Sequence, residues 1–142
     1  MGNKFANTII GSAKKDTIDG RGGVDYLTGG DGADIFRIST RPIFGASASV
    51  HITDFSPTED ILQLSKSAFG FVPNFTNKSI TTASVDTLNT ALASTSTFVY
   101  ESSNGYLYWN QNGSSSGFGT GGIFAILDNR PSALNAANLS LI

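Results

Sequence analysis

The sequence of 142 residues contains no cysteine, which excludes disulfides, a thiol nucleophile and any cysteine-ligated metal site. It has one histidine, His51, and only 14% charged residues with a net charge of −2, so its charge does not favour a nucleic-acid partner. No apolar run reaches the length of a membrane span, and the N-terminal residues show no cleavable signal peptide. The motifs HExxH and GxSxG and the Walker loop are also absent, and we therefore expect no enzyme.

Four nine-residue segments follow one another near the start of the chain, at residues 2–10, 11–19, 20–28 and 29–37. Each begins with glycine, has Asn or Asp at its sixth place and has a large apolar residue at its eighth. The sixth-place residues are Asn7, Asp16, Asp25 and Asp34, and the eighth-place residues are Ile9, Ile18, Leu27 and Phe36. A nine-residue period of this kind predicts a parallel β-roll that binds calcium.

In such a roll one nonapeptide supplies a turn and a strand on one side, and the next returns along the other side. Turns two repeats apart therefore stack, which should bring Asp16 next to Asp34 and Asn7 next to Asp25. Two carboxylates at roughly 4 Å near a protein surface repel each other by about 1–4 kcal/mol. A hard cation between them would reverse this, and calcium accepts carboxylate and main-chain oxygens, whereas zinc and copper prefer thiolate and imidazole.

Residues 2–37 resemble RTX (repeats-in-toxin) nonapeptides, which have the pattern GGxGxDxUx and occur in type I secreted proteins. Residues 29–34 match the full turn, and residues 20–25 match it except for Arg21 at the second glycine. The resemblance implies a right-handed parallel β-roll with calcium held between stacked turns by aspartates and glycine-turn carbonyls. The ligands it implies in the turns are Asp16, Asp34, Asp25, Asn7, Gly11, Gly29, Gly30, Gly32, Gly20 and Gly22.

Of these sites we expect the one between Asp16 and Asp34 to be the strongest, although Lys14 should weaken it. A second site that pairs Asn7 with Asp25 carries one formal charge and should be weaker. Residues 52–64 are similar to the segment that follows the last nonapeptide in many RTX C-terminal domains, so they should cap the roll. In this segment Asp54 and Asp60 either complete a calcium site at the last turn or accept N–H bonds within a turn.

After the repeats the pattern changes to ordinary β-sheet with a little helix. We expect strands at residues 49–55, 61–64 and 123–127, a hairpin of residues 98–101 and 106–109, and one helix within residues 84–93. In the hairpin, Tyr106 and Tyr108 should lie on one face of the sheet and Leu107 and Trp109 on the other. The lone His51 should be a half-buried strand residue. Residues 110–114 alternate oxygen-bearing side chains before a glycine, and a polar hairpin loop is favoured there over a calcium loop.

The expected fold is thus mainly β: a short calcium-binding roll of about two coils (residues 2–37), capped by a C-terminal β-sheet region (residues 38–142) with one short helix. At this length the chain should form a single module over residues 1–142. The resemblance implies a secreted, non-catalytic, calcium-binding C-terminal region of a type I secreted protein, with calcium ions and the type I secretion machinery as partners. The alternative is a polysaccharide-binding accessory module of an extracellular enzyme, similar to the rolls attached to alginate epimerases.

Overall fold

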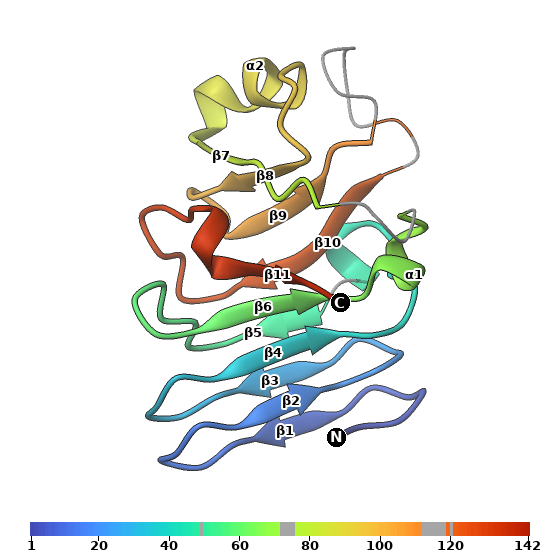
Figure 1. The fold of residues 1–142 in the computed structure, drawn as a ribbon, viewed down its shortest axis with the longest axis vertical. Coiled ribbons are helices and arrows are strands. Elements are labelled where there is room, and N and C mark those ends of the chain that lie inside the picture. The colour runs from blue at the N-terminus through green and yellow to red at the C-terminus, as the bar shows by residue number, and fades with distance from the viewer. Residues whose placement is uncertain (49, 72–75, 112–118, 120) are drawn as a thin grey trace.

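The structure is a computed structural model that describes residues 1–142 except 49, 72–75, 112–118 and 120. Its strands form two sheets, and within each sheet the strands follow one another along the long axis of the molecule, with the N-terminus at one end and helix α2 at the other (Figure 1). A seven-stranded sheet has the order β1-β3-β5-β10-β9-β8-β7, and a four-stranded sheet has the order β11-β6-β4-β2.

The strands of the larger sheet are β1 (Thr8–Ile10), β3 (Tyr26–Thr28), β5 (Val50–Ile52), β10 (Gly122–Leu127), β9 (Tyr106–Trp109), β8 (Phe98–Glu101) and β7 (Ile80–Ala83). Those of the smaller sheet are β2 (Thr17–Asp19), β4 (Ile35–Ile38), β6 (Ile61–Leu64) and β11 (Leu139–Leu141). Short helices connect them: α1 (Lys66–Phe69), α2 (Leu88–Leu92), and the 3-10 turns Ala46–Ala48, Val85–Thr87 and Ala136–Asn138.

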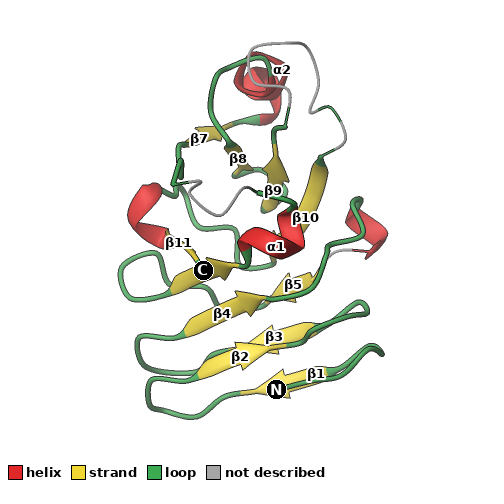
Figure 2. Cartoon of the chain, turned by 45° about the vertical axis from the view of Figure 1, so that its right-hand side comes forward, coloured by secondary structure: helices red, strands yellow, loops and turns green. Residues whose placement is uncertain are grey.

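The predicted register of the repeats is confirmed. Strands β1 and β3 pair in parallel with Thr8 opposite Tyr26, and β2 and β4 pair in parallel with Thr17 opposite Ile35, so each coil takes eighteen residues. Successive nonapeptides alternate between the two sheets, and their turns lie at the two edges of the roll (Figure 2).

The stack of parallel strands continues beyond the repeats. Strand β5 pairs with β3, and β6 pairs with β4, so the segment after the last nonapeptide forms a third coil. Strands β10 and β11, from the C-terminal end of the chain, then pair in parallel with β5 and β6. The two coils expected from the repeats are therefore extended by strands whose sequences show no nine-residue period.

The eighth-place residues face inward as the period requires. Ile18, Leu27 and Phe36 are at most 3% exposed, and Ile9 packs against the same core. The same core continues through Ile52 and Leu62 of the third coil to residues of the C-terminal half such as Phe124. The roll thus shares its hydrophobic interior with its cap.

The C-terminal elements agree with the predicted pattern. Strands β8 and β9 form the predicted antiparallel hairpin, and the predicted helix is present as α2 after a 3-10 turn. Leu107 and Trp109 pack in the main core, while Tyr106 and Tyr108 face a second cluster beneath α2. The sequence did not indicate β7 or the single turn of α1. The loop of residues 110–114 lies mostly outside the described residues.

His51 is a partly buried strand residue, as predicted. Its Nδ1 lies 2.8 Å from Asp128 Oδ1, and its ring stacks on Tyr26 with centroids 4.5 Å apart. These contacts join β3, β5 and the end of β10. Within the described part of the chain, no helix has the length and apolar character needed to cross a membrane.

Candidate metal centre

The side chains at the sixth place of the repeats form hydrogen-bonded ladders along the two edges of the roll. On one edge, the backbone N–H of Asp16 donates to Asp34 Oδ1 at 2.8 Å, and that of Asp34 donates to Asp60 Oδ1 at 2.8 Å. On the other edge, the N–H of Asn7 donates to Asp25 Oδ1 at 2.9 Å. The structure therefore brings together Asp16 with Asp34 and Asn7 with Asp25, and it adds Asp60 to the first ladder.

Asp34 has the most unusual environment of these residues. It is 1% exposed, and its Oδ2 is buried without a hydrogen-bond partner among the described residues. Its carboxylate lies against the α-carbon of Gly29, where no side chain would fit. Neither Asp34 nor Asp25 forms a salt bridge with a described lysine or arginine. A buried carboxylate oxygen with no partner is energetically costly, and it is a ligand that a hard cation would take.

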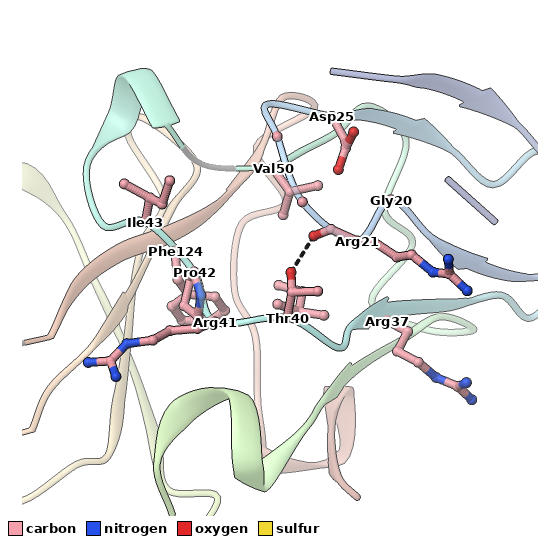
Figure 3. A pocket seen from close by; sticks show the side chains of 13 residues that line it. Gly20, Arg21, Asp25, Arg37, Thr40, Arg41, Pro42, Ile43, Val50 and Phe124 are labelled. Carbon is pink, nitrogen blue, oxygen red and sulfur yellow. Dashed lines mark hydrogen bonds between the residues drawn. The ribbon is translucent and has the colours of Figure 1, made fainter. Parts of the chain in front are cut away.

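Asp25 occupies the equivalent place on the other edge. It is also 1% exposed, and burial raises the pKa of its carboxyl above the usual value, with the nearby charge of Asp19 acting in the same direction. Its carboxylate lies against Gly20. Figure 3 shows Asp25 turned toward a small pocket that the turn 20–25 shares with residues 37–43.

The carboxylate of Asp16 is satisfied within its own turn. Its Oδ2 accepts hydrogen bonds from the backbone N–H of Ser12 at 2.6 Å and from Ser12 Oγ at 2.8 Å. These bonds to Ser12 lower the pKa of the Asp16 carboxyl below its usual value. Asp16 therefore differs from Asp34, its neighbour in the ladder, in having donors already in place.

The carboxylates of Asp54 and Asp60 both accept hydrogen bonds from backbone N–H groups. Asp54 accepts from Gly29 at 2.8 Å and from Gly30 at 2.9 Å, so it ties the third coil to the last repeat turn. Asp60 accepts from Asp34 and, through Oδ2, from Ser56 at 2.8 Å. Burial raises the pKa of the Asp60 carboxyl, and the charges of Asp34 and Asp54 add to this effect. Turn N–H bonding, one of the two roles that the sequence left open for these carboxylates, is thus present for both.

Three of the six predicted glycines, Gly11, Gly30 and Gly32, stand where a side chain would collide with the neighbouring turn, whereas Gly20 and Gly29 lie against the aspartate of their own turn. A Cβ on Gly11 would overlap the carbonyl oxygen of Gly29, and a Cβ on Gly30 would overlap the carbonyl oxygen of Ser12. Gly32 has a φ of 114° and lies against the backbone of Lys14. Gly22 is different, because a Cβ there would meet only Lys4 atoms at 3.6 Å or more. Carbonyl oxygens therefore lie at the contact between stacked turns.

No three His, Asp or Glu side chains gather as a metal site within the described ranges. A metal ion in these turns would therefore take few carboxylates and complete its coordination with main-chain oxygens and water. Calcium accepts six to eight oxygens of these kinds in flexible geometry. The unpartnered oxygen of Asp34, together with nearby carbonyl groups such as those of Gly29 and Ser12, fits such an ion, whose contribution would be structural.

Three residues that shape these turns were not predicted as site residues. Ser12 caps Asp16, and its signal in the sequence is a hydroxyl four residues before a carboxylate. Asp19 is 3% exposed, and its Oδ1 accepts the N–H of Arg21 at 2.9 Å. Arg21 has a φ of 70° at a place where the pattern has glycine. Asp19 had no recognisable signal, because no other repeat has a carboxylate at its ninth place, whereas the left-handed conformation of Arg21 is signalled by the glycine that the pattern has at that place.

Comparison with known proteins identifies the repeats. Residues 1–36 match the family described as RTX calcium-binding nonapeptide repeat, in four copies, and this segment is accordingly a set of RTX calcium-binding repeats. No curated protein matches the chain. Among solved structures, the chain is similar to the AlgE6R3 subunit of the Azotobacter vinelandii mannuronan C5-epimerase, with a TM-score of 0.50 and 20% identity. That similarity covers 98% of this chain and 80% of the other, so nearly the whole of this chain shares its fold with that structure.

Proposed function

We propose that residues 1–142 form one non-catalytic module whose folding is driven by calcium. The observation that carries this proposal is the buried Asp34 Oδ2, which has no hydrogen-bond partner in the described part of the chain. A stable fold does not leave an ionised oxygen in this position without compensation. An ion bound between the turns would supply that compensation.

The proposed mechanism couples metal binding to folding. Without calcium, acidic groups such as Asp34, Asp54 and Asp60 repel one another at the edge of the roll, and the coils are disfavoured. With calcium, the same groups favour the coiled state, because the ion binds the folded turns and has no preformed site in the unfolded chain. The shared core then makes the roll and its cap fold together.

Calcium control of this kind suits a protein that is exported unfolded and meets calcium outside the cell. RTX repeats are typical of secreted proteins, and we extend this to the present chain as the C-terminal region of a type I secreted protein. Fusion of residues 85–142 to a passenger protein tests this. Export that depends on the type I machinery supports the assignment, and retention of the passenger in the cell contradicts it.

Circular dichroism of the whole chain with calcium and with excess chelator tests calcium-driven folding. We expect a β-sheet spectrum only with calcium, and magnesium at the same concentration should not replace it, because magnesium demands a tighter octahedral site. Identical β-sheet spectra with calcium and with chelator would refute the proposal.

A second candidate function is binding of an acidic polysaccharide. Arg21, Arg37 and Arg41 contribute to the pocket beside the turn 20–25, and their side chains extend outward around it (Figure 3). The shared fold with a module of a mannuronan C5-epimerase supports the same idea. Arginine pairs well with carboxylates, which every unit of mannuronan carries.

Titration of the calcium-loaded protein with mannuronan oligomers tests the second candidate. Binding that weakens with salt and is lost in R21Q/R37Q/R41Q would support it. The variant K4Q/K14Q/K15Q removes the same number of charges from other turns and serves as the control. Equal binding by both variants, or none by the wild type, would argue against this surface.

A further inference from the structure

The four repeat turns have two different conformations. In turns 2–7 and 11–16 the second residue is Asn3 or Ser12, and its N–H donates to the sixth-place side chain, Asn7 Oδ1 at 2.9 Å or Asp16 Oδ2 at 2.6 Å. The second residue also accepts the N–H of the fourth residue through its own side chain, at 2.8 Å for Asn3 and 3.2 Å for Ser12. We call these closed turns, since their polar groups satisfy one another.

Turns 20–25 and 29–34 have a different backbone. Their second residues, Arg21 and Gly30, have φ values of 70° and 90°, and their fourth residues, Gly23 and Gly32, have values of 104° and 114°. These left-handed positions suit glycine and are unfavourable for other residues. We call these two open turns.

In the open turns the second N–H is directed to a group outside the turn. Arg21 donates to Asp19 Oδ1 at 2.9 Å, and Gly30 donates to Asp54 Oδ2 at 2.9 Å. The sixth-place carboxylates, Asp25 and Asp34, therefore receive no N–H from their own turn. In each carboxylate, Oδ1 accepts the ladder hydrogen bond from a backbone N–H of the preceding coil. Its Oδ2 accepts no hydrogen bond among the described residues.

We propose that the roll holds two calcium ions, one at each open turn, and that the residue at the second place decides whether a turn takes metal. This inference rests on the proposed calcium-driven folding and goes further, since the sequence favoured Asp16 as a ligand. To bind an ion through Oδ2, Asp16 would have to give up two hydrogen bonds from Ser12. Two bonds to a charged group correspond to a loss in affinity of at least about 100-fold.

Asp60, in the third coil, belongs with the closed turns. Its Oδ2 accepts the N–H of Ser56, four residues earlier, as Asp16 accepts that of Ser12. Its other oxygen accepts the N–H of Asp34. The proposal therefore assigns no ion to Asp60 as the primary carboxylate, and the same holds for Asp54, whose oxygens both bind N–H groups of the turn 29–34.

Isothermal titration of the whole chain with calcium chloride tests this count. The wild type should bind two ions, D16N should still bind two, and D34N and D25N should each bind one. The control D31N removes an exposed carboxylate from the same turn as Asp34 and should still bind two. The double variant S12G/K14G removes the Ser12 cap and places glycine at the second and fourth places of its turn, and it should bind a third ion.

The outcomes separate the two proposals. A wild type that takes up no calcium refutes calcium-driven folding. A wild type that binds calcium, but in a number other than two, or that loses an ion in D16N, refutes the assignment to open turns and leaves calcium-driven folding intact. If D34N or D25N fails to fold, the other two variants still test the assignment. Two ions bound by D16N and three bound by S12G/K14G support it, and any other pair of counts overturns it.

Discussion

Replacing Asp34 with Asn should change the stability of the protein in opposite directions with and without calcium. The Asn side chain has the same shape, and its Oδ1 can still accept the N–H of Asp16, but the charge on the buried oxygen is removed. An unsatisfied buried polar group costs about 1–3 kcal/mol, and more when it is charged. The calcium-free variant should therefore be more stable than the calcium-free wild type by about 1–2 kcal/mol.

Calcium should reverse this order. At a concentration 100 times the dissociation constant, one bound ion stabilises the folded state by about 2.7 kcal/mol, and D34N loses the ion that Asp34 would hold. The free energy of unfolding of the variant relative to the wild type should thus fall by about 2.7 kcal/mol on adding calcium. Under these conditions the wild type becomes the more stable protein.

Folding can be followed by circular dichroism while trimethylamine N-oxide is added, since this osmolyte favours the compact state even where the calcium-free chain is unfolded. In chelator, the osmolyte midpoint of D34N should lie below that of the wild type; in calcium, where the chain is already folded, D34N should unfold at a lower urea concentration than the wild type. D31N, which removes an exposed charge from the same turn, should not show the reversal. A D34N variant that is destabilised by the same amount in both conditions would show that Asp34 acts only through its ladder bond, and the reasoning would fail.

Three further predictions concern the cap and the shared core, measured by urea unfolding in calcium. Phe36→Ala empties a fully buried site beside the ring of Phe55 and should lower the free energy of unfolding by about 3–5 kcal/mol; a change below 1 kcal/mol would contradict one continuous core. Gly105→Ala should destabilise by about 2 kcal/mol or more, because φ is 75° and a Cβ would overlap the Leu127 carbonyl; no effect would show that the hairpin turn can move. Burial raises the pKa of Tyr100 to about 12, so the folded state retains the phenol proton more tightly than the unfolded state, and stability should fall as the pH rises from about 10 to about 12. This fall should be smaller by on the order of 2 kcal/mol in Y100F, and parallel pH profiles of the two proteins would refute it.

The sequence was sufficient to predict the roll because its period is a geometric requirement. A glycine, a carboxylate and an apolar residue at fixed places define which turns stack and which side chains face inward, and both features are found at Asp34 and Phe36. The hairpin of β8 and β9 was predictable for a similar reason, since an apolar strand, a turn ending in Gly105 and a second apolar strand are local signals.

The continuation of the roll could not be predicted in this way. Strands β5 and β10 pair in parallel although they come from distant parts of the chain, and neither shows a repeat that would indicate the partner. The difference between closed and open turns could not be predicted from the sequence either, because it depends on the direction of single backbone N–H groups. Ser12 turns its N–H back to Asp16, whereas Gly30 donates to Asp54 in the following coil.

The parallel pairing of β5 with β10 and of β6 with β11 means that the third coil has neighbours on both sides only when the last twenty-one residues are present. In a fragment that stops before Gly122, β5 and β6 would become edge strands, with Ile52 and Leu64 at their ends. The unpaired backbone groups of such strands favour pairing with strands of other molecules. These contacts also join residues far apart along the polypeptide, which raises contact order and slows refolding. Shortening the chain from its C-terminal side should thus produce aggregation and not a smaller calcium protein.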